Sequence, residues 1–327
     1  MTDIWIITDG KKGTENQCIG LAESLDQEYK LIRIKPLFGI NHLPSILWTL
    51  PLGKLPLFFL YGSKEILSFN LPKVIIASGK ASVGISIILK KYKKDKIMVI
   101  QIQDPRVSSR YFDIVSSPLH DDTLGNNVIK TFGALNRINT RSISKAKIEF
   151  REDFSAFKKP IIALLIGGEN KHFKMRQKEI KDLVAMLNKL QNDRDTTILT
   201  TFSRRTSPKI KNFLKSNLEN YINITCSQKK DNAYFGYLAY ADYFVVTEDS
   251  ISMVSEVATT GKPVYVFQLK GKSKKFEKFY EQLYNRKAIR NFRGIIEEPW
   301  KYESLNDTYK VTKYLKDNFP NYFKDTK

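Results

Sequence analysis

Short hydrophobic runs alternate with longer amphipathic segments along the first half of the chain. The runs predict strands, at 3–9, 29–35, 73–78, 96–103 and 112–118. Segments between them, such as 15–25 and 81–92, repeat their apolar positions with helical spacing. Strands that alternate with helices predict an α/β domain built on a parallel sheet.

A second alternating set begins at a hydrophobic run over 160–168. It continues with a helix at 178–190, a strand at 196–203, a helix opened by Ser207 and Pro208, and a strand at 222–227. The stretch 242–267 then reads as strand, turn, helix and strand, with Gly261 ending the helix. The chain therefore predicts two Rossmann-like domains in succession.

The segment 139–159 is charged and lacks a clear period, which places a domain boundary there. We expect an N-terminal domain at 1–150, a C-terminal domain at 151–305 and a helical tail at 306–327 that can return to brace the first domain. The length of 327 residues agrees with two domains, at roughly 100 to 200 residues each.

Charge changes this picture by pointing to anionic partners. The chain has 54 Lys and Arg against 34 Asp and Glu, a net charge of +20, which attracts phosphate-bearing molecules. The sequence carries no zinc-finger spacing, RNP-type aromatic motif or basic heptad region, so nucleic acid is not an expected partner. Nucleotides and anionic lipid remain.

Cysteine and histidine usage gives little support to a metal site or to disulfides. Cys18 and Cys226 are too few and too far apart for a disulfide framework, and the three histidines are scattered. The N-terminus runs directly into a strand and lacks the features of a signal peptide. These features predict a cytoplasmic protein that binds no metal and no cofactor.

The segment from Leu43 to Gly62 is almost uncharged and contains a tryptophan and paired phenylalanines. Pro44, Pro51 and Pro56 would interrupt a membrane-spanning helix. Two interpretations stay open: short elements that dip into an anionic membrane surface, on the inner face of the cytoplasmic membrane, or a core segment beneath the first sheet.

Three turns at the expected carboxyl ends of strands in the second domain carry polar and glycine residues. Gly167 and Gly168 follow one strand, where backbone N–H groups without a neighbouring Cβ can approach an anion. Two further turns follow neighbouring strands and supply Ser203, Arg204, Arg205, Asp249, Ser250 and Ser252. Arginine suits bidentate contact with phosphate, so we expect these turns to hold a diphosphate. Taken singly, each glycine pair also fits an ordinary tight turn, and each arginine a surface ion pair.

Glu256 is an acidic residue in an otherwise apolar helix, about one and a half turns below this edge. It is either a solvated or lysine-paired carboxylate, or a ligand-binding group.

The pattern SISMVSEVATTGKPVYVF followed by KGKSKKFEKFYEQL resembles the nucleotide-sugar half of GT-B glycosyltransferases, in particular those that add N-acetylglucosamine to the peptidoglycan lipid precursor. In those enzymes a glutamate ahead of a Gly-x-Pro segment grips the ribose of UDP. The resemblance implies that role for Glu256, because an ionised carboxylate can accept hydrogen bonds from two hydroxyls.

Further motifs cover nearly the whole chain: DGKKGTENQ, the SGK at 78–80, QDPR, FDIVSSPLHD, TFGALNRI, GGEN, FSRRT, EDSISMVSE and KFEKFYEQL. Together they are similar to the family named after the plant elongated-mitochondria fission factor and its bacterial relatives. The resemblance implies a GT-B-like fold of two Rossmann-like domains with parallel sheets facing a central cleft. It also implies a glycosyltransferase role for bacterial members.

The preferred interpretation is metal-independent transfer of a sugar from a nucleotide-diphosphate sugar to a glycan or lipid-linked envelope acceptor. The triplet from Asp193 to Asp195 lies at the opposite end of its strand and reads as a loop, not as a metal site. Asp9 and Glu15 are the preferred candidates for a general base, with Asp104 and His120 as alternatives. A nucleotide-sugar epimerase, and a noncatalytic membrane-associated adaptor like the plant member, are the rival functions.

Overall fold

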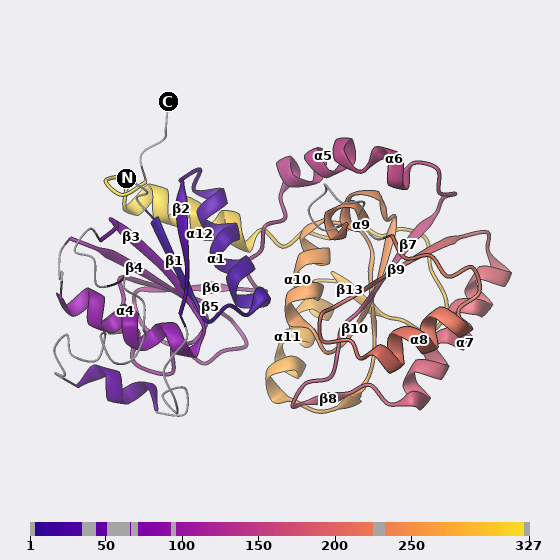
Figure 1. Cartoon of the computed structure of the whole chain (residues 1–327), viewed down its shortest axis with the longest axis horizontal. Coiled ribbons are helices and arrows are strands. Elements are labelled where there is room, and N and C mark those ends of the chain that lie inside the picture. The colour runs from indigo at the N-terminus through magenta and orange to yellow at the C-terminus, as the bar shows by residue number, and fades with distance from the viewer. Residues whose placement is uncertain are drawn as a thin grey trace. The chain divides into compact units, whose positions relative to one another are not determined.

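The computed structural model describes residues 4–34, 44–50, 66, 71–92, 96–224 and 233–323 (Figure 1). The chain divides into two units. The first unit combines Met1–Arg137 with Asn306–Lys327, and the second unit is Ile138–Leu305. Each unit has a parallel sheet and its own core, so the predicted α/β class is confirmed.

The first unit is built on a six-stranded parallel sheet of order β2-β1-β3-β4-β5-β6. Its strands are β1 (Ile4–Thr8), β2 (Tyr29–Arg33), β3 (Val74–Ser78), β4 (Met98–Ile102), β5 (Ile114–Pro118) and β6 (Val128–Thr131). Its helices are α1 (Lys12–Ser24), α4 (Lys80–Tyr92) and α12 (Asp307–Asn318), with 3₁₀ turns at Ser45–Thr49 and Ser109–Tyr111. One core cluster lies on the α4 side of the sheet and another on the side of α1 and α12. Because both faces are covered, β1, β3, β4 and β5 are buried along their whole length and read as continuous hydrophobic runs.

The second unit has a five-stranded parallel sheet of order β13-β11-β10-β7-β9. Its strands are β7 (Ile161–Ile166), β9 (Thr197–Phe202), β10 (Tyr243–Thr247), β11 (Val264–Phe267) and β13 (Ile289–Asn291). A separate antiparallel pair joins β8 (Phe173–Lys174) to β12 (Lys270–Gly271). Its helices are α5 (Thr140–Glu149), α6 (Arg151–Phe154), α7 (Gln177–Asp193), α8 (Pro208–Asn217), α9 (Tyr234–Tyr240), α10 (Ile251–Thr259) and α11 (Lys274–Asn285).

The strand order determines where each unit can bind a ligand. The first strand of the second unit, β7, lies between β9 on one side and β10 on the other, so the direction of winding reverses between β7 and β10. In the first unit the same reversal lies between β1 and β3. Ligands of open α/β sheets bind outside the carboxyl ends of the strands at such reversals.

Two predicted features of the second unit differ from the structure. The strand expected at 222–227 is represented by one bridge, Ile222 to Leu199, and residues 225–227 lie outside the described residues. The boundary expected at 150/151 lies instead between Arg137 and Ile138. The reason is that α5 and α6 pack on α9, where the Phe154 ring contacts Tyr237 at 5.3 Å between centroids.

The C-terminal helix α12 packs in the first unit, where its first residue contacts backbone groups after β6 that lie 175 and 174 residues earlier in the chain. Asp307 accepts hydrogen bonds from the backbone N–H groups of Phe132, at 2.9 Å, and Gly133, at 2.8 Å. Val311 and Leu315 are buried in the core cluster of α1. The chain therefore begins and ends in the same unit.

The segment from Leu43 to Gly62 lies mostly outside the described residues, apart from 44–50. Both interpretations of this segment, membrane contact and a place in the core, stay predictions. Among the described helices, none combines the length and the apolar character that a bilayer crossing requires.

Candidate functional site

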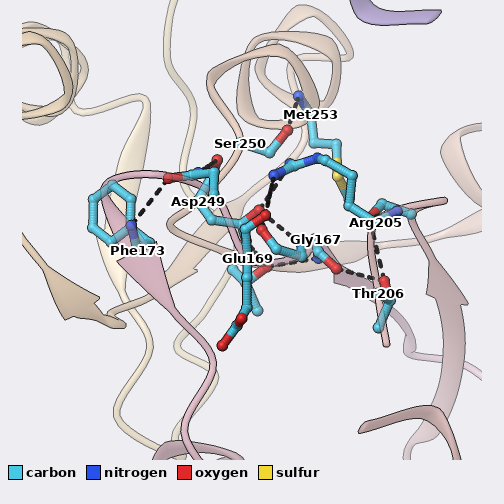
Figure 2. Close-up of polar contacts among 12 residues, drawn as sticks. Gly167, Glu169, Phe173, Arg205, Thr206, Asp249, Ser250 and Met253 are labelled. Atoms are coloured by element: carbon cyan, nitrogen blue, oxygen red, sulfur yellow. Dashed lines mark hydrogen bonds and ion pairs between the residues drawn. The ribbon is translucent and has the colours of Figure 1, made fainter. Parts of the chain in front are cut away.

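The winding reversal of the second unit brings three loops together at the carboxyl edge of its sheet. The loop after β7 carries Gly167 and Gly168, the loop after β10 carries Asp249 and Ser250, and the loop after β9 carries Arg205. Figure 2 shows Gly167, Arg205, Asp249 and Ser250 as neighbours in space, as the order β10-β7-β9 requires, and Gly168 joins them through its hydrogen bond to Asp249.

Asp249 is the centre of this loop cluster. Its carboxylate is buried and accepts hydrogen bonds from Gly168 N at 2.8 Å, Thr247 Oγ1 at 2.7 Å and Arg205 Nη2 at 2.9 Å. Burial raises the pKa of Asp249, while these three donors oppose that rise. One carboxylate therefore joins all three loops, which is a positioning role and leaves it little capacity for ligand.

The two glycines are required by close packing. A Cβ on Gly167 would lie 2.2 Å from both carboxylate oxygens of Asp249, and a Cβ on Gly168 would lie 2.4 Å from the carbonyl group of Arg205. Their N–H groups are also engaged, since Gly167 N donates to Thr247 Oγ1 at 2.8 Å and Gly168 N donates to Asp249. The expected contact of these amides with a diphosphate is therefore replaced by a scaffolding role.

The two arginines of the β9 loop differ in their surroundings. Arg205 donates to Gly168 O at 2.8 Å in addition to Asp249, and Figure 2 shows its side chain extended over the neighbouring loop. Ser203 Oγ accepts from Arg205 N at 3.1 Å and so shapes the same loop. Arg204 is exposed to solvent. Of the two guanidinium groups, that of Arg205 is engaged within the loop cluster, whereas Arg204 is exposed.

The N-terminus of α10 supplies the polar groups that face this edge. Ser250 is the N-cap residue and its Oγ accepts a hydrogen bond from Met253 N at 3.4 Å. The first-turn N–H groups of a helix have no partners four residues earlier, and the helix dipole favours negative charge beside them. Ser252 is half-buried in this first turn. The arrangement suits an anion at the end of the helix.

Glu256 lies deeper in α10, and among the described residues it forms no ion pair with a lysine. Its carboxylate is half-buried and accepts a 2.6 Å hydrogen bond from Tyr234 Oη, at the start of α9. Burial raises the pKa of Glu256 to about 7, and the bond from Tyr234 opposes that rise. The group therefore changes its charge near neutral pH.

The other end of α9 is fixed by the residue that follows the α10 turn. Lys262 Nζ donates to the carbonyl oxygens of Leu238, Ala239 and Ala241, at 2.9, 2.8 and 2.6 Å. Burial lowers the pKa of Lys262 to about 8. The lysine of the Gly-Lys-Pro segment is thus a cap for the C-terminal carbonyl groups of α9.

The site residues predicted from the sequence do not include Thr247, Tyr234 or Glu248. Glu248 is half-buried, its carboxylate accepts from Leu269 N at 2.9 Å, and burial raises the pKa of Glu248. Its backbone carbonyl accepts a 2.6 Å hydrogen bond from Tyr280 Oη. A carboxylate directly after a buried strand was the signal available for Glu248, whereas nothing in the sequence links Tyr234 to a helix that follows it.

The two candidate bases of the first unit have different environments. Glu15 is 2% exposed and is held by Arg33, with Nε at 2.7 Å and Nη2 at 3.1 Å. This hydrogen bond is the main reason that the pKa of Glu15 is lowered. Asp9 lies at the end of β1 and accepts from Lys11 N at 3.2 Å and Thr14 Oγ1 at 3.3 Å. The contacts of Glu15 favour a structural role. Asp9 follows β1 at the winding reversal of the first unit, where a ligand would bind, and stays a candidate base.

The alternatives to these bases lie in turns of the same unit. Asp104 accepts a 2.9 Å hydrogen bond from Arg106 N in a turn where Gln103 and Arg106 both have positive φ, 70° and 57°. His120 is 4% exposed. Positive φ in residues other than glycine stores strain, and such strain gathers at functional turns.

Within the described residues, no three His, Cys, Asp or Glu side chains gather as a metal site would require. The triplet from Asp193 to Asp195 ends α7 at the amino edge of β9, and Asp195 forms an ion pair with Lys158 there. The triplet lies at the edge opposite the loop cluster, as its sequence position predicts.

Comparison with solved structures identifies the fold as GT-B-like. UDP-GlcNAc 2-epimerase of Methanocaldococcus jannaschii superposes with a TM-score of 0.53 at 14% identity, covering 96% of this chain and 99% of that chain. The glycotransferase of kitacinnamycin also gives 0.53, at 11% identity over 98% and 92%. MurG of Acinetobacter baumannii gives 0.50, at 11% identity over 97% and 90%.

Sequence comparison identifies the family. The protein RP120 of Rickettsia prowazekii (strain Madrid E) is 30% identical over 96% of this chain and 98% of its own length. Mitochondrial fission protein ELM1 of Arabidopsis thaliana is 29% identical over 93% of this chain and 88% of its own. The model of the family described as Mitochondrial fission ELM1 matches residues 12–319. The chain therefore belongs to the mitochondrial fission ELM1 family.

Proposed function

We propose that the chain transfers a sugar from a nucleotide-diphosphate sugar to a hydroxyl of an envelope or lipid-linked glycan. The observation that carries this proposal is Glu256, a half-buried carboxylate in the helix that starts at the winding reversal of the second sheet. Burying a carboxylate costs free energy of desolvation, and side chains whose pKa is shifted in this way gather at functional sites. The site residues below are part of the proposal.

The N-terminus of α10 would hold the diphosphate. Ser250 presents its hydroxyl group at the N-cap, Ser252 presents one in the first turn, and Arg204 adds an exposed guanidinium. The Asp249 network does not bind the anion in this scheme. It fixes the loop after β7 against the start of α10, so that the binding groups need no rearrangement.

Glu256 would hold the ribose. A carboxylate has about four acceptor positions, and Tyr234 occupies one, so two ribose hydroxyls can still donate to it. Tyr234 therefore orients the carboxylate and leaves it available. The ionised form is the stronger acceptor for both hydroxyls, which makes binding dependent on the pKa of about 7.

No metal or cofactor is needed in this proposal. Negative charge that develops on the departing diphosphate is stabilised by the α10 dipole and Arg204, worth about 0.3–1 kcal/mol for an exposed helix terminus and up to about 2 kcal/mol when partly buried. A general base takes the proton of the acceptor hydroxyl, and Asp9 is our candidate. We place the reaction in the cytoplasm, at the inner face of the membrane.

Structural relatives support this choice of donor. The M. jannaschii epimerase has been solved in complex with UDP-GlcNAc and UDP, and that structure matches this chain with a TM-score of 0.50 over 96% of its length. A 2-epimerase reaction would use the same donor and would release a changed sugar without an acceptor. Product analysis with and without acceptor separates the two reactions.

A noncatalytic adaptor is the second candidate, and membership of a family named for mitochondrial fission favours it. An adaptor needs the fold but not the chemistry of Glu256. It would tolerate substitutions of Glu256 and Arg204 that a transferase cannot.

Thermal unfolding with a panel of nucleotide sugars tests the proposal. A bound ligand raises the apparent stability by mass action, about 2.7 kcal/mol at one hundred times its Kd. We expect a nucleotide sugar to raise the Tm of the wild type and of Glu281→Gln, an exposed control on α11, but not of Glu256→Gln. Absence of any shift across the panel would favour the adaptor.

A further inference from the structure

Two segments of the second unit carry an unusual concentration of positive charge. Residues 171–178 and 270–278 contain nine Lys or Arg side chains and a single carboxylate, Glu277. All nine cationic residues are exposed. We refer to these two segments as the basic surface.

The fold brings the two segments together from positions about one hundred residues apart. Strands β8 and β12 pair antiparallel, with Lys270 opposite Lys174 and Gly271 opposite Phe173. A Cβ on Gly271 would lie 2.2 Å from the carbonyl oxygen of His172, so the pairing is tight. The ring of Phe276 in α11 packs edge-on against Phe173, 4.9 Å between centroids. Figure 1 shows β8 and α11 at one end of the second unit.

The electrostatic repulsion between these lysines lowers the stability of the folded second unit. Like charges directly opposite each other in an antiparallel ladder repel, and Lys174 and Lys270 are such a pair. Glu169 approaches Lys174 at 3.9 Å, which offsets only part of that repulsion. An exposed surface with this excess of positive charge attracts a negatively charged partner, and binding that partner would relieve the repulsion.

The chemistry of the basic surface favours lipid headgroups over other anions. Eight of the nine cations are lysines, which act as hydrated point charges and suit a diffuse negative surface, whereas Arg176 alone has the planar fork that reads a fixed phosphate. The aromatic rings are used internally: Phe173 is buried, and Phe276 packs on it. Single-stranded nucleic acid is bound through exposed aromatic rings on which bases stack.

The basic surface also adjoins the candidate site. The Asn170 side chain donates to Asp249 O at 3.0 Å and accepts from the N–H groups of His172, at 2.7 Å, and Phe173, at 3.0 Å. The loop that scaffolds the site therefore leads directly into β8.

We propose that the basic surface docks the second unit onto an anionic lipid bilayer, through electrostatic attraction and without insertion. The exposed large hydrophobic residues of the described chain all lie outside 171–178 and 270–278, so the contact is held by charge. If the transferase proposal holds, this docking presents the donor site to a lipid-linked acceptor. The docking itself does not depend on that activity.

Vesicle sedimentation of the full chain tests the docking. The probe is phosphatidylcholine vesicles in which about one lipid in three is phosphatidylglycerol, compared with phosphatidylcholine alone. The test variant combines Lys171→Glu, Lys270→Glu and Lys274→Glu. It keeps the fold, because Lys270→Glu would face Lys174 across the ladder and Lys274→Glu lies at the start of α11.

The control variant combines Lys181→Glu, Lys189→Glu and Lys215→Glu, exposed positions on α7 and α8. Both variants change the net charge equally, so their difference isolates the basic surface from the general charge of +20. Circular dichroism verifies that both fold.

We expect the wild type to bind anionic vesicles only, and to be released when salt rises from about 0.1 M to about 0.5 M. The test variant should bind about 100-fold more weakly, and the control should stay within about threefold of wild type. Equal losses in both variants, or no binding to anionic vesicles, would overturn the proposal. The proposal would also be overturned if mixed-sequence single-stranded RNA, at the same phosphate concentration, bound the wild type more tightly than the vesicles do and bound the test variant much more weakly.

Discussion

At the scale of single residues, Gly167, Gly168 and Arg205 have a different role in the structure from the one their sequence positions predict. Their position at the carboxyl edge could be predicted, because strand order brings these loops together. Their hydrogen bonds could not, because Gly167 N pairs with Thr247, 80 residues away along the chain. No local pattern distinguishes a glycine that meets a ligand from one that meets a buried carboxylate.

Gly167→Ala tests this scaffolding role. The new Cβ would fall 2.2 Å from both carboxylate oxygens of Asp249, so the loops must separate and the buried hydrogen bonds weaken. We expect a loss of about 1–3 kcal/mol in the free energy of unfolding of the second unit, measured by urea denaturation. Gly13→Ala, at an exposed position in α1, is the control and should be neutral or slightly stabilising. Equal effects at both sites would show that Gly167 is an ordinary turn glycine.

Glu256 gives a prediction for pH. Its pKa is raised to about 7 in the folded chain, so between about 4.5 and 7 the folded state binds more protons than the unfolded state, and stability falls as pH rises through that window. Glu256→Gln should remove this dependence and make the protein more stable than wild type at pH 8, by up to about 3 kcal/mol. Urea denaturation at pH 5 and pH 8 measures it, with Glu281→Gln as the control.

The same substitution separates stability from function. Nucleotide-sugar affinity of the wild type should rise between pH 6 and pH 8, because the ionised carboxylate is the better acceptor. Glu256→Gln should be stable yet bind poorly at both pH values. If instead it bound the nucleotide sugar as the wild type does, Glu256 would be a core residue and the proposed ribose contact would fail.

At the scale of helices and strands, burial decided what the sequence could predict. Strands covered on both faces, such as β1 and β7, are continuous hydrophobic runs and stand out. The edge strand β6 alternates in exposure, the three-residue β13 is partly exposed, and neither was predicted. Helix α5 lies in the segment 139–159, which has no clear period because the helix buries Ala146 alone among its ten residues.

Helix α9 shows how elements of the site depend on one another. Its first residue, Tyr234, binds Glu256, and its last carbonyl groups bind Lys262, so α10 and the turn after it hold α9 at both ends. The helix has seven residues, too few to be stable alone. Residues 225–232, which lead into it, lie outside the described residues. A sequence pattern cannot reveal these contacts, because Tyr234, Glu256 and Lys262 each look like an isolated polar residue along the chain.

At the scale of the whole molecule, the second unit is inserted between two parts of the first. The chain leaves the first unit at Arg137 and returns at Asn306. The stability of the first unit therefore depends on contacts that can form only after the second unit has been synthesised.

Asp307 is the residue on which that return depends most clearly. It is 4% exposed and its two carboxylate oxygens accept from Phe132 N and Gly133 N, so Asp307→Ala would remove this acceptor from both N–H groups, of which that of Gly133 is buried. An unmet buried donor costs about 1–3 kcal/mol. We expect a loss of that order or somewhat more in the first unit, with hydrogen exchange accelerated in β1, β3 and α1 and unchanged in β7 and β10. Asp317→Ala, exposed on the same helix, should change neither. Uniform acceleration across both sheets would mean that the two units unfold together, and the division at Arg137 and Asn306 would then have no thermodynamic counterpart.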